Sequence, residues 1–368
     1  MSDLESFEGP IADAALIVTC GPGGVGKTTT AAALGVAAAR AGRRVVVVTV
    51  DPARRLADAL GLEQGAAADA PHRVTNLPDE TGDGELWALM LDAASTFDRL
   101  VREQTASAKQ ADAILENPVY RAISGSLAGA QEYMAIERLH QLHTSGEWDL
   151  VIVDTPPSRH AIDLLEAPDR LIGFLSHPVY RTLTAGQRAF AKVTNAAASM
   201  FLWAVRRLAG PQIVEDTVEF FRSLANIEPG LRQRAEEVSV LLRSDDATFV
   251  VVSSPRAEAI GEAEHLIGAL RDGDFPFAGV VVNLIHPMPE ELTAADRAAL
   301  ADLDDGPLAD HVAWHDELTE LATAEREEIA ALADLAEDVA VVELPLMPVD
   351  VHDVDGLVGL AEKLTGHR

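Results

Sequence analysis

The sequence predicts an α/β protein in which a parallel sheet is flanked by helices and carries an inserted helical subdomain. Short, β-branched apolar runs recur along the chain, and segments with helical periodicity separate them. Such runs are typical of strands buried on both faces, as in a parallel sheet covered by helices. Two long helical gaps interrupt the alternation, which indicates that a helical subdomain is inserted into the core.

The strands follow from the apolar runs in chain order. The gaps after the third and the fourth run are the longest, and both carry helical patterns. We therefore expect an α/β core of residues 1–94 and 241–368 with the strand and loop 148–160, and a helical subdomain of residues 95–147 and 161–240. The predicted strands are Ala15–Thr19, Arg44–Val50, Leu86–Leu91, Leu150–Asp154, Phe249–Ser253, Val280–Asn283 and Val339–Leu344.

Composition excludes several classes of protein. The chain has 368 residues, of which 48% are hydrophobic and 24% charged, so it is long and apolar enough for a sizeable core. Its formal net charge of -30 argues against a nucleic-acid binder and against a polybasic membrane module. No apolar run approaches the length of a membrane span, and the acidic N-terminus does not resemble a signal peptide. We expect a cytoplasmic protein without an integral membrane segment.

The strongest functional signal is a glycine-rich loop between the first strand and an alanine-rich helix expected to begin near Thr29. The loop reads GPGGVGKT and matches the phosphate-binding pattern GxxxxGK[ST], in the strand–loop–helix context that supports such a motif. Its backbone N–H groups can surround a phosphate, Lys27 can reach the β- and γ-phosphates, and the Thr28 hydroxyl can bind Mg²⁺. The nucleotide-binding residues expected here are Gly21, Gly23, Gly24, Val25, Gly26, Lys27, Thr28 and Thr29.

Two aspartates follow predicted strands, at the edge where an open parallel sheet binds its ligands. Asp51 begins the stretch DPARR, and Asp154 begins DTPP. A carboxylate in this position can hold a metal-bound water or orient the water that attacks the phosphate. ATP is the expected nucleotide, because none of the four lysines belongs to the NKxD element with which related GTPases bind guanine.

Together these elements resemble the ArsA-like ATPases, the family of the arsenite-pump ATPase and of the targeting factor for tail-anchored membrane proteins. The matching segments occur in family order across nearly the whole chain: Gly21–Thr30, Asp51–Leu60, Leu86–Asp92, Trp148–His160 and Pro345–Leu357. The resemblance implies an ATP-dependent dimer, formed with itself or with a paralogue, whose helical subdomain faces a hydrophobic client or an effector.

The resemblance also implies roles for individual residues. Asp51 would act in catalysis with Lys27 by orienting the hydrolytic water, and Asp154 would hold Mg²⁺ through water beside Thr28. Asn283 and the loop Pro345–Pro348, with Met347, would line the adenine pocket.

Three departures from the family pattern qualify these expectations. The position of the signature lysine, which would reach across a dimer to the partner's phosphates, is Pro22 here, and proline offers neither charge nor N–H. Cys20 is the only cysteine, so the zinc clasp of the targeting factor and the thiol triad of the arsenite pump are absent from this sequence. Met200 is the only methionine between Ala135 and Pro287, so no methionine-lined groove is visible.

Weaker patterns leave alternatives open. An apolar helix face from Phe190 to Leu208 fits either subdomain core or a client groove, and Arg54 or Arg55 could supply the missing cation or be surface residues. His140 and His143 have metal-ligand spacing on one helix but fit a solvated face better, and Glu290–Glu337 predicts an acidic, solvated helical surface. Two further functions compete: a weakly hydrolysing regulatory subunit, which Pro22 favours, and a small-molecule kinase, which the DPA and DTPP elements disfavour.

Overall fold

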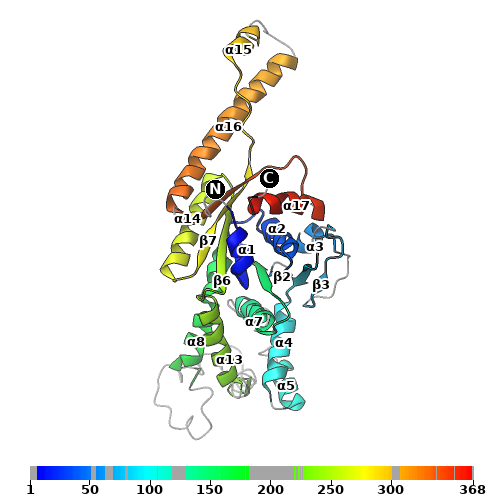
Figure 1. Cartoon of the computed structure of the whole chain (residues 1–368). Helices are drawn as coiled ribbons and strands as arrows, with labels where there is room; N and C mark the ends of the chain where they lie inside the picture. The colour runs from blue at the N-terminus through cyan, green and yellow to red at the C-terminus, as the bar shows by residue number, and fades with distance from the viewer. Residues whose placement is uncertain are drawn as a thin grey trace.

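One sheet organises the molecule, with the strand order β3-β4-β2-β5-β1-β6-β7-β8 in the computed structural model. Each neighbouring pair is parallel except β3 with β4, which is antiparallel. The predicted α/β fold, a mostly parallel sheet flanked by helices, is confirmed (Figure 1). The structure describes residues 6–50, 55–62, 69–78, 82–105, 107–117, 130–156, 158–178, 180–181, 219–220, 223, 225, 227–300, 307–336, 338–351 and 353–366.

Apart from β3, the observed strands coincide with the predicted runs to within a few residues, because most of their residues are apolar and buried. The two-residue β3 was not predicted, since it is too short to produce an apolar pattern. The strands are β1 (Leu16–Cys20), β2 (Arg44–Thr49), β3 (His72–Arg73), β4 (Glu85–Met90), β5 (Leu150–Asp154), β6 (Ala247–Ser253), β7 (Phe277–Ile285) and β8 (Ala340–Pro345).

Helices cover both faces of the sheet. Alternate residues of a strand enter the two hydrophobic cores, so Leu16 and Val18 lie in one core and Ile17 in the other. The described helices are α1 (Glu8–Asp13), α2 (Lys27–Arg40), α3 (Arg55–Ala59), α4 (Ala93–Gln104), α5 (Ala108–Leu115), α7 (Ala130–Thr144), α8 (Ser158–Ser176), α13 (Glu228–Leu241), α14 (Ala257–Asp272), α15 (Ala294–Leu300), α16 (Pro307–Leu335) and α17 (Val354–Leu364).

The helix that follows the glycine-rich loop is held closely against the sheet. Most of α2 is alanine, its residues Ala31–Ala39 are buried, and α17 packs on it. At Gly35 a Cβ atom would lie only 2.7 Å from Cγ2 of Val47 on β2. Small side chains therefore allow α2 to approach the strands, which fixes the position of the loop at its N-terminus.

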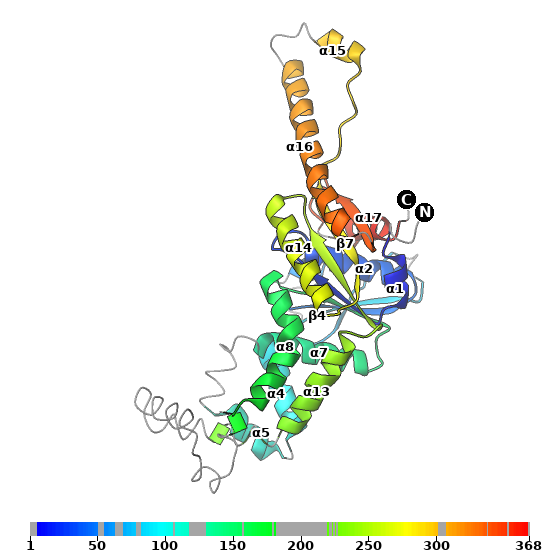
Figure 2. The ribbon, with the colours of Figure 1, turned by 90° about the vertical axis from the view of Figure 1, so that its left-hand side faces the viewer.

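A group of helices, α4, α5, α7, α8 and α13, lies at one end of the molecule (Figure 2). Inside it, the fully buried carboxylate of Glu137 on α7 forms an ion pair with Arg234 on α13. Asp69, in the loop before β3, forms ion pairs with Arg99 of α4 and Arg138 of α7, and so joins this group to the core. These helices overlap the segments 95–147 and 161–240 expected for the helical subdomain, and the division of the chain into core and subdomain remains a prediction. The face from Phe190 to Leu208 lies outside the described residues.

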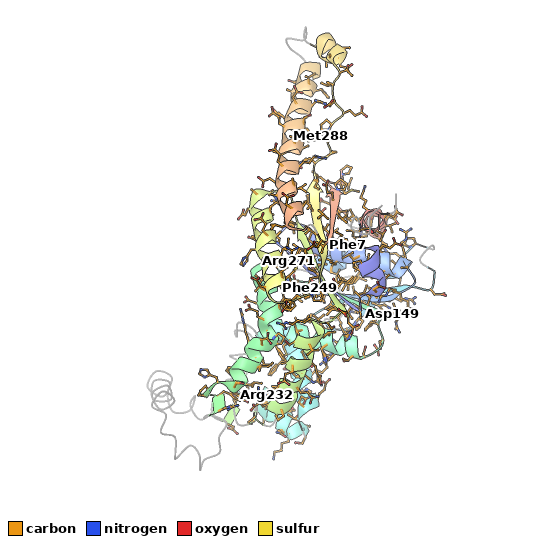
Figure 3. The ribbon with its side chains drawn as sticks, turned by 60° about the vertical axis from the view of Figure 1, so that its left-hand side comes forward. Phe7, Asp149, Arg232, Phe249, Arg271 and Met288 are labelled. Carbon is orange, nitrogen blue, oxygen red and sulfur yellow. The ribbon has the colours of Figure 1, made fainter. Side chains whose placement is uncertain are left out.

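The acidic segment after β7 forms an arm rather than a flat surface. Helix α16 and the short α15 project from the end of the molecule opposite the helical group, and an extended segment containing Met288 runs beside α16 (Figures 2 and 3). The buried residues of α16 are Ala322, Glu325, Ile329 and Leu332, all in its C-terminal half, whereas Trp314 is 62% exposed. The prediction of a solvated helix holds for the outer half of the arm.

At its base the arm is tied to the sheet by one carboxylate. Glu325 accepts a hydrogen bond from the backbone N–H of His286 at 2.8 Å, and its other oxygen lies 2.7 Å from Nδ1 of His286. His286 directly follows β7, the strand that also carries Asn283. Nowhere in the described ranges is a helix long and apolar enough to cross a membrane.

Candidate functional site

The glycine-rich loop occupies the carboxyl end of β1 and has a backbone that requires glycine. Gly21 has φ of +153°, and a Cβ atom there would lie 2.0 Å from the carbonyl oxygen of Val252 on β6. Gly26, the N-cap of α2, has φ of +90°, and its Cβ would lie 2.2 Å from Nδ2 of Asn283. The loop therefore turns tightly against two neighbouring strands and leaves its N–H groups at the start of a helix, which favours anion binding there.

Lys27 is the first residue of α2, and its side chain folds back along the loop. The residue is only 8% exposed, and its Nζ donates a hydrogen bond of 2.6 Å to the carbonyl oxygen of Pro22. Pro22 itself is buried. Pro22, at the signature-lysine position, thus contributes a backbone carbonyl that orients Lys27. It contributes no positive charge.

Below the loop, the carboxylate of Asp154 receives two hydroxyl groups on the same oxygen. Thr28 donates to Oδ2 of Asp154 at 2.7 Å, and Thr49, the last residue of β2, donates to the same atom at 2.9 Å. Asp154 is 1% exposed and Thr49 2%. Thr28 and Asp154, the two residues expected to hold Mg²⁺, are thus in direct contact although 126 residues separate them in sequence.

Asn283 is brought against the loop by an irregularity in β7. The register of β7 with β8 shifts between Val282 and Ile285, and Leu284 has a left-handed φ of +66°. Beside this bulge the Asn283 side chain reaches the glycine-rich loop, where its Nδ2 donates a 3.0 Å hydrogen bond to the carbonyl oxygen of Val25. The amide orientation is fixed by that bond, since a carbonyl acceptor must face the NH₂ group.

A cavity of about 680 Å³ joins the loop to the segment after β8. Of the predicted residues, it is lined by Gly23, Gly24, Gly26, Lys27, Thr28, Thr29, Asn283, Pro345 and Met347. Gly21, Val25, Asp154 and Pro348 do not line it; the first two shape the loop, and Asp154 lies behind Thr28. Leu346, in the predicted loop Pro345–Pro348, also lines it. The lining further includes residues that the sequence did not single out: Asp58, Ala59, Thr155, Leu284, Val349, Asp350, Val351 and Leu360.

The segment 345–351 forms the second wall of this cavity. The backbone N–H of Leu346 donates to the carbonyl oxygen of Ile285 at 2.8 Å, which fixes the segment beside the bulge in β7. The walls are apolar at this end, through Pro345, Met347 and Leu360, and polar at the loop end. A cavity of this size with one apolar and one phosphate-binding end can hold a nucleotide.

Three expected residues cannot be placed. Asp51 and Arg54 lie outside the described residues, and for Arg55 only its backbone position, at the start of α3, is described. The residue before Asp51 is fixed, because the N–H of Val50 donates to the carbonyl oxygen of Asp154 at 3.2 Å. The roles expected of these three residues remain predictions.

His140 and Cys20, the weaker candidates for metal binding and thiol chemistry, both lie in at least partly buried surroundings. His140 is half-buried, with Nε2 3.5 Å from a carboxylate oxygen of Glu237, and burial lowers its pKa. Across the described part of the chain, no three His, Cys, Asp or Glu side chains are grouped to hold a metal ion. Cys20 is buried at the end of β1, and burial raises its pKa to about 12.

Comparison with known proteins agrees with this geometry. A family model for anion-transporting ATPases (ArsA_ATPase) matches residues 14–299. The chain is 25% identical over 347 residues to the ATPase GET3 of Malassezia globosa, covering 94% of this chain and 88% of that protein. It is 28% identical over 293 residues to ATPase GET3 of Phaeosphaeria nodorum, covering 78% and 82%. It is 24% identical over 349 residues to the ATPase ASNA1 homolog of Dictyostelium discoideum, covering 94% and 87%.

Proposed function

Since this chain belongs to the anion-transporting (ArsA-like) ATPase family and is an ATP-hydrolysing enzyme, we propose that it acts as a nucleotide-driven switch. In this proposal it binds Mg-ATP in the cavity beside the glycine-rich loop. Hydrolysis opens and closes a dimer and changes its hold on a partner bound to the helical subdomain. The observation that carries the proposal is the single cavity lined by Lys27 and Thr28 at one end and by Asn283 and Pro345 at the other.

The phosphate end of the cavity suits the triphosphate. Among the described residues that line the cavity, Lys27 has the one positive side chain, where a γ-phosphate would be held against the start of α2. Binding of a phosphate would give Lys27 Nζ a charged acceptor in place of the neutral carbonyl of Pro22, with which it now makes a 2.6 Å hydrogen bond. The N–H groups of the loop and Lys27 then stabilise the charge that develops on the transferred phosphoryl group.

The base end suits adenine. One of the two N–H groups on Nδ2 of Asn283 is engaged with Val25, so the side chain can offer its amide oxygen, a hydrogen-bond acceptor, and the second N–H to a bound base. Adenine carries an exocyclic amino group that can donate to such an acceptor, whereas guanine carries a carbonyl at the corresponding position. We therefore propose that Asn283 favours ATP over GTP, with Pro345 and Met347 packing against the ring.

The residues near Thr28 fit a magnesium ion. Hydroxyl and carboxylate oxygens are the ligands that Mg²⁺ prefers, and Thr28 and Asp154 provide one of each, joined by a 2.7 Å hydrogen bond. We propose that Thr28 binds the ion directly and Asp154 through water. When bound, the ion neutralises phosphate charge and polarises the γ-phosphoryl group. Asp51 would orient the attacking water from the chain just beyond Val50.

A dimer is proposed because apolar side chains are exposed beside the cavity. Leu346 is 41% exposed and Val349 72%, and both line the cavity. A second copy, or a paralogue, that covered this face would shield them and would close over the nucleotide. The helical group also exposes apolar side chains, among them Phe174 at 43% and Val240 at 70%, which supports a hydrophobic client there. ATP supply makes the cytoplasm the proposed compartment.

The alternative is a weakly hydrolysing regulatory subunit that pairs with a lysine-bearing paralogue. Its support is Pro22, since a cation in trans on the γ-phosphate can be worth about 10³–10⁵ in rate in other P-loop enzymes. Under this alternative the chain binds ATP in the same cavity but turns it over slowly when alone.

The test is steady-state ATP and GTP hydrolysis over a range of protein concentration, for wild type and Pro22→Lys. A homodimeric switch predicts preference for ATP, a rate per chain that rises with concentration, and a further rise in Pro22→Lys. A rate that is slow in both proteins and accelerates only with an added paralogue supports the alternative. A fast wild-type rate with no concentration dependence contradicts the dimer, and equal use of GTP contradicts the role of Asn283.

A further inference from the structure

Asp154 lies between two threonines at the same level of the sheet. It is the register partner of Thr19 on β1 and of Thr49 on β2. The two hydroxyls are used differently. Thr49 donates to the Asp154 carboxylate at 2.9 Å, whereas Thr19 donates to the backbone carbonyl of Val153 at 2.9 Å. Of these two hydroxyls, the one on β2 contacts the side chain expected to serve the metal.

The hydroxyl of Thr49 interrupts a run of apolar residues. The residues before it, Val45–Val48, are fully buried valines, and Thr49 is itself 2% exposed. Valine has nearly the same shape as threonine, so packing alone would be satisfied by a fifth valine. Burying a hydroxyl is unfavourable unless it forms a hydrogen bond, and a carboxylate is a stronger acceptor than a carbonyl group.

The contact also joins the two strands that end at the site. The N–H of Val50 donates to the carbonyl oxygen of Asp154, so side chain and backbone of Asp154 are both bonded to the end of β2. Thr28 shares the Oδ2 atom with Thr49, and a threonine that coordinates a metal through its oxygen can keep donating its hydrogen. Coordination of the metal by Thr28 would therefore leave Oδ2 of Asp154 in place, and the hydrogen bond from Thr49 to that oxygen would persist.

We propose that Thr49 is a positioning residue for the magnesium site, which holds the carboxylate of Asp154 in the orientation that accepts a metal-bound water. The inference rests on the proposed function, since it requires that Mg-ATP binds in this cavity. Partners that orient a metal's ligands typically contribute about 10–100-fold to metal affinity. Loss of the Thr49 hydroxyl should therefore weaken the effect of Mg²⁺ on nucleotide binding and leave metal-free binding intact.

The experiment is calorimetric titration of a non-hydrolysable ATP analogue into the full chain, once with Mg²⁺ and once with EDTA. The quantity compared is the ratio of the two affinities in wild type, Thr49→Val, Thr49→Ser and the matched control Thr19→Val. We expect the ratio to fall about 10–100-fold in Thr49→Val, with the EDTA affinity within about twofold of wild type. Thr49→Ser and Thr19→Val should both keep the wild-type ratio.

Thermal melts of each variant verify folding, and Thr49→Ala replaces Thr49→Val if the valine variant has lost its cooperative transition. An unchanged ratio in Thr49→Val overturns the inference. So does an equal loss in Thr49→Ser, which would implicate the methyl group, or in Thr19→Val, which would implicate sheet packing. If wild type binds the analogue equally with and without Mg²⁺, the inference fails while nucleotide binding stands. If wild type does not bind the analogue at all, the proposed function fails first.

Discussion

At the scale of single residues, the site depends on contacts between positions far apart in the chain. Asn283 bonds to the backbone of Val25, and Asp154 to the side chains of Thr28 and Thr49. Each contact joins the end of one strand to the end of another or to the loop beside it. Parallel strands place their carboxyl ends at one edge, so residues at the ends of separate runs meet there without being near in sequence.

The buried thiol gives a prediction at this scale. Cys20 is buried at the end of β1, and burial raises its pKa to about 12, so almost none of it is thiolate near neutral pH. We expect a thiol-reactive chromophore to label the native protein very slowly and the denatured protein at once. Bound nucleotide should slow the labelling further, because it stabilises the folded state. Rapid stoichiometric labelling of the native protein would contradict the burial of Cys20.

Cavity-lining residues could be predicted where they belong to a contiguous sequence motif or to a segment that resembles a known family. The phosphate loop could be predicted because its glycines and Lys27 are contiguous, and Asn283 because a family resemblance pointed to it. Thr49 could not, since its partner Asp154 is 105 residues away and a threonine at the end of a valine run looks like ordinary sheet. Leu284 was missed for a related reason: a left-handed leucine at a bulge follows from tertiary packing rather than local preference.

At the scale of elements, strands were easier to predict than helices. A strand buried on both faces is a continuous apolar run, whereas α2 is buried through alanines that carry little amphipathic pattern. The arm was recognisable only as an acidic, helical stretch. Its projection from the molecule depends on where Glu325 meets His286, a pairing across 39 residues that no local pattern encodes.

That pairing predicts how the arm is anchored. In Glu325→Ala the partly buried N–H of His286 loses its acceptor, and the loss of a hydrogen bond typically costs about 0.5–1.5 kcal/mol. We expect faster amide hydrogen exchange in the C-terminal half of α16 and a lower melting temperature. The exposed neighbour Glu327 provides the control, and Glu327→Ala should leave both measurements unchanged. Equal exchange in the two variants would mean that apolar contacts of Ile329 and Leu332 alone hold the arm.

At the scale of the whole molecule, the large negative net charge affects the stability of the folded state. A net charge of -30 on a chain of 368 residues makes the folded state repel itself, and salt screens that repulsion. The screening length falls from about 10 Å at 0.1 M to about 3 Å at 1 M ionic strength.

We therefore predict that the melting temperature rises by roughly several degrees between 0.05 and 1 M KCl, because the shorter screening length weakens the repulsion between acidic side chains in the folded state. An equal osmolality of an uncharged osmolyte is the control, which separates screening from general solvent exclusion. Differential scanning calorimetry at both salt concentrations makes the measurement. A melting temperature that stays constant or falls with KCl would show that the acidic surface is compensated locally by its arginines.

We infer that this chain hydrolyses ATP in the cavity formed by the glycine-rich loop, Asn283 and the segment after β8. Single-turnover release of phosphate from ATP, with wild type and Lys27→Ala in parallel, tests it most directly; Lys109→Ala, an exposed lysine on α5, is the matched control. We predict release by wild type and Lys109→Ala, and a rate on the order of 10²–10³ lower in Lys27→Ala, because one charge contact to the phosphoryl group is lost. Equal rates in wild type and Lys27→Ala would mean that ATP is hydrolysed at another site.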